Sequence, residues 1–139
     1  MSGPSKWAQP PAPPLSLTET NQRLHALTEE LERQHKDLED LLGKQLQVDL
    51  AYNLRYAAAI QASDAGSEDR RKAEATAAMA QQYLDDEPDV DLATRRATVD
   101  MQVRAQREFA HNLRAELNAM QTLSANLRAE IGLAGGVRP

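Results

Sequence analysis

Apolar residues recur every three or four positions from Leu92 to Ile131, with polar residues between them. This period matches one face of an α-helix and not the two-residue alternation of a strand. The pattern therefore predicts one long amphipathic helix. Its apolar face comprises Val99, Val103, Phe109, Leu113, Leu117, Met120, Leu123, Leu127 and Ile131.

A second long helix is predicted over residues 17–62. Ser16 or Thr18 is suited to cap its first turn, and Gln34 interrupts an otherwise apolar inner row. Seven-residue repeats of leucine predict a coiled-coil seam, formed by Leu17, Leu24, Leu31 and Leu38 with Leu27 and Leu41 between them.

The end of this helix has two apolar sides. One carries Val48, Tyr52, Tyr56 and Ile60, and the other carries Leu46, Leu50, Leu54 and Ala58. Because one neighbouring helix covers only one side, we expect residues 46–62 to contact more than one partner.

Two breaks divide the rest of the chain. A turn at Ser63–Gly66 precedes Ser67, a strong helix start, and predicts a shorter helix over about 68–84. The second break contains Pro88, where the chain either kinks or turns back. We favour a kink, after which the third helix runs over about 89–131 and covers Leu24–Leu42 with Leu92–Leu113.

The predicted fold is all-α: an elongated antiparallel helical hairpin, or coiled coil, of two long helices and one shorter helix. Residues 16–132 form the helical domain, and residues 1–15 and 133–139 are predicted to be disordered tails. The first tail is proline-rich and contains Trp7, which is either part of a short linear motif or an incidental aromatic residue.

In this arrangement the end of the third helix projects uncovered beyond the first helix. Several apolar side chains exposed on one helix favour association, so we expect a homodimer or higher oligomer, and a different protein partner is an alternative. The expected interface joins this end to the second apolar side of the first helix. It comprises Leu117, Met120, Leu123, Leu127, Ile131, Leu46, Leu50 and Leu54.

The chain has a net charge of −5, yet residues 91–139 carry seven arginines and five acids. A row of basic residues on the third helix is a candidate for contact with nucleic-acid phosphates. Asp100 and Glu108 are spaced to pair with this row, so a salt-bridged, solvated face is the alternative. The candidate phosphate contacts are Arg96, Arg104, Arg107 and Arg114, with His111 on the same arc.

The sequence indicates no catalysis. It has no cysteine, its three histidines are not spaced as metal ligands, and it carries no phosphate-binding loop or nucleophile motif. We therefore expect a protein that is not an enzyme and has no cofactor or metal. The sequence has no apolar run long enough to span a membrane and no signal peptide, so we expect a cytoplasmic location with no membrane partner.

Two resemblances bear on function. Tyr83-Leu84-Asp85-Asp86-Glu87 is similar to the Y-x-x-x-[DE] signal of type VII secretion substrates, although the turn at Ser63–Gly66 lacks their W-x-G motif. Other segments resemble small helical proteins of bacteriophage early gene clusters. These segments are Tyr56–Ala59, Gly66–Ala75, Leu113–Leu117 and Leu123–Arg128.

The second resemblance implies a phage or prophage accessory to DNA recombination or replication, and we expect a non-enzymatic coiled-coil adaptor with this role. One alternative is a structural assembly component, such as a scaffold or virion protein, that does not bind nucleic acid. The other alternative is a helical hairpin protein related to type VII secretion.

Overall fold

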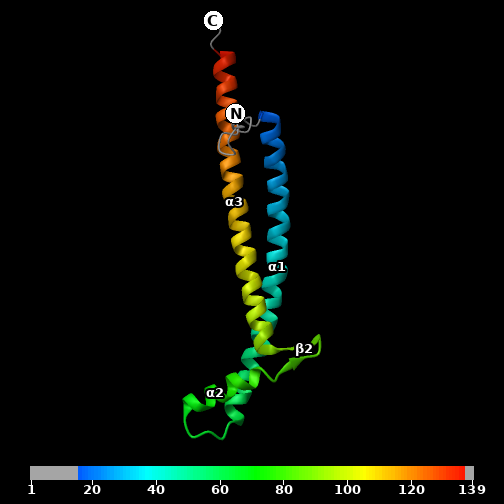
Figure 1. Ribbon diagram of the computed structural model, residues 1–139, viewed down its shortest axis with the longest axis vertical. Helices are drawn as coiled ribbons and strands as arrows, with labels where there is room; N and C mark the ends of the chain where they lie inside the picture. Colours follow the sequence, from blue (N-terminus) through cyan, green and yellow to red (C-terminus); the bar gives the residue numbers. More distant parts are fainter. Residues whose placement is uncertain (1–15, 137–139) are drawn as a thin grey trace, which may run out of the picture. The chain divides into compact units, whose positions relative to one another are not determined.

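The computed structural model describes residues 16–136 and confirms the all-α class, with two long helices and one short helix. The helices are α1 (Leu17–Ala62), α2 (Glu68–Met79) and α3 (Leu92–Gly136) (Figure 1). Two short strands, β1 (Tyr83–Leu84) and β2 (Glu87–Asp91), stand between α2 and α3. The proline-rich tail and Trp7 lie outside the described residues.

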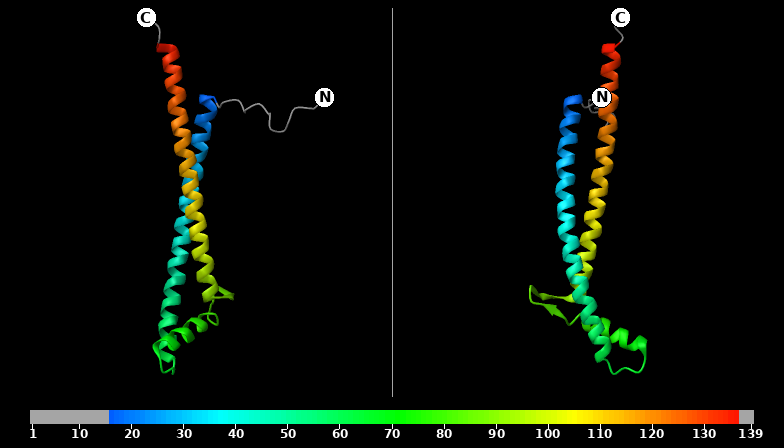
Figure 2. Two further views of the ribbon diagram at one scale, coloured as in Figure 1. Left: turned by 60° about the vertical axis from the view of Figure 1, so that its left-hand side comes forward. Right: turned by 180° about the vertical axis from the view of Figure 1, so that it is seen from behind.

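The described chain divides into two units, each containing part of α1 and part of α3. The central unit is Glu30–Leu113, and the terminal unit comprises residues 16–29 and 114–136. In the central unit α1 and α3 are antiparallel (Figure 2). Gln45 Nε2 donates to Asp100 Oδ1 at 2.8 Å. Gln106, farther along α3, donates from its Nε2 to the carbonyl and side-chain oxygens of Gln34, which lies earlier in α1. Gln34, which interrupts the leucine seam, thus has a polar partner on the facing helix.

The core of the central unit lies where α1, α2 and α3 meet. It is built from the buried residues Val48, Met79, Leu92, Val99 and Val103. The partly buried tyrosines Tyr52 and Tyr56 of α1 pack against this core, with their rings stacked at a centroid separation of 6.0 Å. Val48 and the tyrosines, which lie on one of the two apolar sides predicted for the end of this helix, therefore face the interior.

Each helix begins at a side chain that caps its first turn. Ser16 Oγ accepts the amide hydrogen of Glu19 at 3.1 Å, and Ser67 Oγ accepts that of Arg70 at 3.2 Å, as their positions predicted. Asp91 Oδ1 accepts the amide hydrogen of Thr94 at 2.8 Å at the start of α3. This backbone hydrogen bond, together with one from the Thr94 hydroxyl, lowers the pKa of Asp91.

The predicted kink at Pro88 is wrong, because the chain forms an antiparallel β-hairpin there. Tyr83 pairs with Asp91 and Leu84 with Glu87, and the register is irregular between the two pairs. Pro88 has no amide hydrogen and lies in this irregular part of β2, where a ladder donor is not required. Accordingly α2 ends at Met79 and not near residue 84, and α3 starts at Leu92 and not near residue 89.

In the terminal unit the start of α1 packs against the end of α3. Leu27 is buried, and the buried Ser124 donates from its hydroxyl to Asn21 Oδ1 at 3.2 Å. Arg23 Nε donates to Glu116 Oε1 at 3.1 Å on the surface. The other seam leucines of this unit, Leu17 and Leu24, are half-buried as predicted.

Most of the end of α3 is covered, contrary to the expected overhang. Leu117, Met120, Leu123 and Leu127 are half-buried in the terminal unit, and only Ile131 of the predicted set is largely exposed. The cause is the register: Arg96 lies beside Asp49, so α3 begins farther along α1 than expected. The helix also continues through Gly132 to Gly136, beyond the end predicted near Ile131.

Candidate protein-binding interface

The most unusual surface of the central unit is the second apolar side of α1. Leu46, Leu50 and Leu54 are exposed by 71%, 59% and 65% of their surface. They lie away from Val48, which faces the core, because residues 46 and 50 are rotated from residue 48 by about half a turn and residue 54 by about a third of a turn. The structure leaves uncovered the leucines that the sequence predicted to meet a second neighbour.

This surface carries no charge. Every exposed residue of α1 from 46 to 62 is leucine, alanine, glutamine or asparagine. The two charged residues of the segment, Asp49 and Arg55, are half-buried and have partners within the central unit. We call this surface the leucine face, formed by Leu46, Gln47, Leu50, Asn53, Leu54, Ala57, Ala58 and Gln61.

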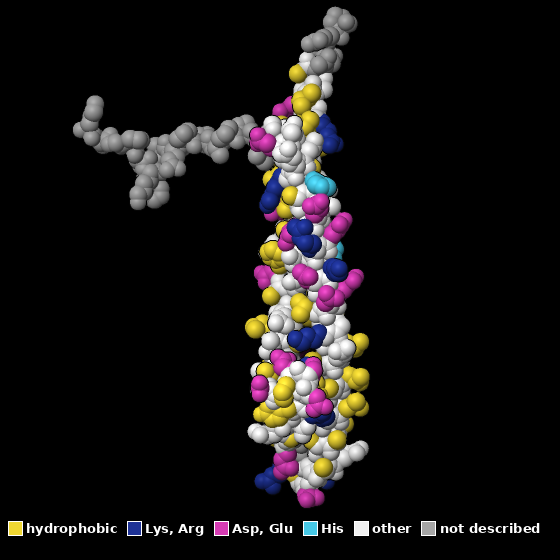
Figure 3. Space-filling view, turned by 90° about the vertical axis from the view of Figure 1, so that its right-hand side faces the viewer, with side chains coloured by type: hydrophobic (Ala, Val, Ile, Leu, Met, Phe, Trp, Pro, Cys, Tyr) yellow, Lys and Arg dark blue, Asp and Glu magenta, His cyan; other side chains and the backbone are white. Residues whose placement is uncertain are grey.

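Exposed leucines in uncharged surroundings are typical of the centre of a protein interface, where charged residues are depleted. The contrast with the rest of the chain is clear, since 27% of its residues are charged. Figure 3 shows hydrophobic side chains standing out from the surface of the molecule among charged ones. The leucine face is therefore the best candidate for a binding surface.

The predicted arginine row separates into residues with different roles. Arg96 is half-buried, and its Nε lies 3.4 Å from Asp49 Oδ1. Its guanidinium carbon stacks over the Tyr52 ring, 4.2 Å from the ring centroid. Arg104 and Arg107 are exposed, and neither forms an ion pair in the part of the chain that the structure describes. Arg114 is exposed and belongs to the terminal unit.

The carboxylates expected to neutralise this row do not do so. Asp100 accepts a hydrogen bond from Gln45 and pairs with neither Arg96 nor Arg104. Glu108 is exposed and forms no ion pair with Arg104 among the described residues. The spacing argument for a salt-bridged face is therefore wrong at these two positions.

An arginine that the sequence analysis did not single out holds the β-hairpin against α3. The Arg95 side chain is 4% exposed; its Nη1 and Nη2 donate to Asp86 Oδ1 and Oδ2 at 2.9 and 3.0 Å. Its Nε lies 3.2 Å from Glu87 Oε2 without the alignment of a hydrogen bond. The hydrogen bonds from Arg95 lower the pKa of Asp86, and the more distant charge of Lys44 acts in the same direction.

One signal for Arg95 was present in the sequence. It lies three residues after Leu92 and four before Val99, on the inward face of α3, where a lone cation requires an anionic partner. Asp86 and Glu87 are that partner.

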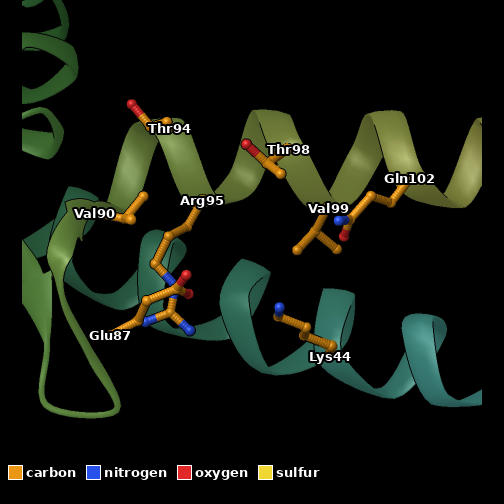
Figure 4. Close-up of a pocket in the computed structure, with 8 residues that line it drawn as sticks. All are labelled: Lys44, Glu87, Val90, Thr94, Arg95, Thr98, Val99 and Gln102. Carbon is orange, nitrogen blue, oxygen red and sulfur yellow. The ribbon is translucent and has the colours of Figure 1, made fainter.

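Beside Arg95 is a hollow of about 270 Å³ in the central unit. Arg95 and Glu87 lie together at one side of the hollow, and the Lys44 side chain extends toward it from α1 (Figure 4). Glu87 and Asp86, which does not line the hollow, both pair with Arg95, so the charge of this arginine already has partners. Its lining is Lys44, Glu87, Val90, Thr94, Arg95, Thr98, Val99 and Gln102.

The segment that is similar to a secretion signal lies in the hairpin. Tyr83 is 46% exposed in β1, and its carbonyl oxygen accepts a hydrogen bond from Arg55 at 3.0 Å. Asp86 and Glu87 are both bound by Arg95. Leu84 packs against the core, so four of the five residues of this segment are tied into the central unit.

Among residues 16–136, no group of three or more histidines and carboxylates is arranged to hold a metal ion. Within the same residues, none of the helices combines the length and apolar character that crossing a bilayer requires.

Comparison with known proteins gives no family assignment. No family model, curated protein or solved structure matches this chain.

Proposed function

We propose that this protein is a non-enzymatic helical adaptor in the cytoplasm that binds another protein chain through the leucine face. The observation that carries the proposal is the exposure of Leu46, Leu50 and Leu54 on a surface without charge. A helix with an apolar stripe can lie along such a face and bury its leucines at the same helical spacing.

A photoreactive amino acid placed at Leu50 tests the adaptor role in the native host. We expect it to form a covalent adduct with a protein chain, a second copy included, because a bound helix would lie within reach of this position. The same amino acid at Gln121, which is exposed in the terminal unit, is the control and is expected to form no adduct. No adduct at position 50, or equal yields at both positions, would contradict the proposal.

A second candidate function is an accessory role in phage or prophage DNA recombination or replication. The resemblance to phage early proteins suggests it, and the exposed Arg104 and Arg107 support it because no ion pair occupies them in the described residues. An arginine without a carboxylate partner is available to displace counterions from a phosphate backbone.

This candidate predicts salt-dependent binding of single-stranded DNA. Arg104→Ala plus Arg107→Ala is expected to weaken that binding. The steepness of the plot of log K against log salt concentration is expected to fall by about 0.7 for each phosphate that the arginines no longer neutralise. Arg70→Ala plus Lys72→Ala, which removes two exposed cations from α2, is the control. Fluorescence anisotropy across a salt titration measures both. Equal losses of affinity in the two variants would show that the effect is one of net charge alone.

A large ordered assembly that is indifferent to these arginine changes would instead support the structural alternative, a scaffold or virion component. Electron microscopy of the purified chain distinguishes this outcome from a small adaptor.

A further inference from the structure

Large and small residues are unequally distributed along the leucine face. The leucines lie at positions 46, 50 and 54, toward the N-terminal end of the face, and the alanines Ala57 and Ala58 follow them. The face extends over about 22 Å from Leu46 to Gln61, at 1.5 Å per helical residue. A helix that packs antiparallel to this face contacts the alanines with its N-terminal part and the leucines with its C-terminal part.

The arrangement is self-complementary for two antiparallel copies. A two-fold axis near residues 53 and 54 places Leu50 of one copy opposite Ala57 of the other, and Leu46 opposite Gln61. The central Leu50 then faces the small Ala57, while Leu46 and Leu54 face the uncharged side chains Gln61 and Asn53, so the two helices can interdigitate at the middle of the face. Two parallel copies would instead set leucine on leucine and leave a gap between alanines.

Charge favours the same arrangement. Glu39 and Glu32 precede Leu46 by one and two heptads, so they continue the line of the leucine face toward the N-terminus, and both are exposed. A parallel pair of α1 helices would bring each glutamate against its copy. In an antiparallel pair limited to residues 46–61, the exposed residues of both copies are uncharged, although the chain as a whole is negatively charged.

The other candidate occupant of the face is the end of α3. Four of its five predicted contact residues are half-buried within the terminal unit, leaving Ile131 as the exposed member of that set. This predicted contact set at the end of α3 therefore exposes less apolar surface than the leucine face.

We propose that the leucine face binds the leucine face of a second copy, with the two α1 helices antiparallel. This inference rests on the proposed adaptor role of the same surface and names its partner. A helix pair of this length buries less than the roughly 800 Å² per partner of a standard interface. The dimer is therefore expected to be weak, with Kd in the micromolar range.

Sedimentation equilibrium of the full chain across the micromolar range tests the pairing. The unmodified chain is expected to shift from monomer to dimer, and Leu50→Glu is expected to raise the Kd by about 30-fold or more, as for a central interface residue. Leu50 is 59% exposed, so the change spares the core, and circular dichroism verifies that the helices remain. Leu133→Glu, at an exposed leucine of the terminal unit, is expected to leave the Kd unchanged.

The chain contains no cysteine, so introduced cysteines report the orientation. Mixing the Leu50→Cys chain with the Ala57→Cys chain is expected to give the mixed disulfide, and Leu50→Cys alone is expected to give little cross-linked dimer. Efficient cross-linking of Leu50→Cys with itself would overturn the antiparallel pairing. A preference of Leu50→Cys for Ile131→Cys would overturn self-pairing of the face and assign it to the end of α3.

The two proposals fail differently. A chain that stays monomeric in sedimentation but forms adducts with another protein at position 50 in cells overturns self-pairing and leaves the adaptor role intact. A chain that stays monomeric and forms no adduct overturns both.

Discussion

Replacing Leu92 with alanine is expected to lower the free energy of unfolding by about 3 kcal/mol, as for other buried leucines. Leu92 is fully buried at the first turn of α3 and packs in one cluster with Val48, Met79 and Val99. Its amide also donates to the Gln82 carbonyl oxygen at 2.7 Å, which fixes the end of the hairpin. The alanine variant keeps this hydrogen bond and leaves a cavity where α1, α2 and α3 meet.

Urea titration followed by circular dichroism measures this loss of stability, at one protomer concentration because association adds to apparent stability. Leu133→Ala makes the same chemical change at a leucine that is 69% exposed, and it is expected to alter the unfolding free energy by less than about 0.5 kcal/mol. A loss at Leu133 as large as at Leu92 would show that helix propensity, and not the core, sets the effect.

Replacing Arg95 with methionine is expected to cost about 2 kcal/mol of unfolding free energy, since the variant cannot form the hydrogen bonds to charged groups but keeps the aliphatic stem. Hydrogen exchange of the hairpin amides should accelerate more than that of α1, because Arg95 holds Asp86 and Glu87 against α3. Arg104→Met, at an exposed arginine of the same helix, is the control and is expected to cost less than about 0.5 kcal/mol.

The Arg95 variant should also change the dependence of stability on pH. The native pKa of Asp86 lies below its usual value, so this carboxylate stabilises the fold above about pH 3.9 and loses that effect as the pH falls through its native pKa. We expect part of the acid destabilisation below about pH 3.9 to disappear in Arg95→Met. Parallel acid unfolding curves in the two proteins would contradict the role assigned to this pair.

Local patterns predicted the helices well, and the reasons are visible in particular residues. Ser16 and Ser67 cap the helices that begin after them, and the spacing of Leu46, Leu50 and Leu54 predicted a second apolar side. These features depend on neighbouring residues, so a single sequence contains the information. The same is true of the candidate interface, whose leucines were identified by spacing alone.

Local sequence patterns could not predict the β-hairpin or the register of α3 against α1. The hairpin depends on Arg95, which reaches back nine residues to Asp86, and a proline among acids resembles a simple helix break. The register is ambiguous because leucines that repeat every seven residues fit one another at several alignments. The prediction therefore assigned too much of α3 to an uncovered end.

The polar pairs between α1 and α3 have a consequence for how the chain folds. If α3 slid by one heptad in the central unit, Gln34 would be separated from Gln106 and face Val99 or Leu113, and the amide of Gln45 would be separated from Asp100. Each misaligned state would leave a half-buried amide without its partner, while its leucine contacts would remain almost as favourable. Gln34, Gln45 and Gln106 thus disfavour misaligned states of a chain with a repetitive apolar seam, and we expect near-native kinetic traps to be short-lived.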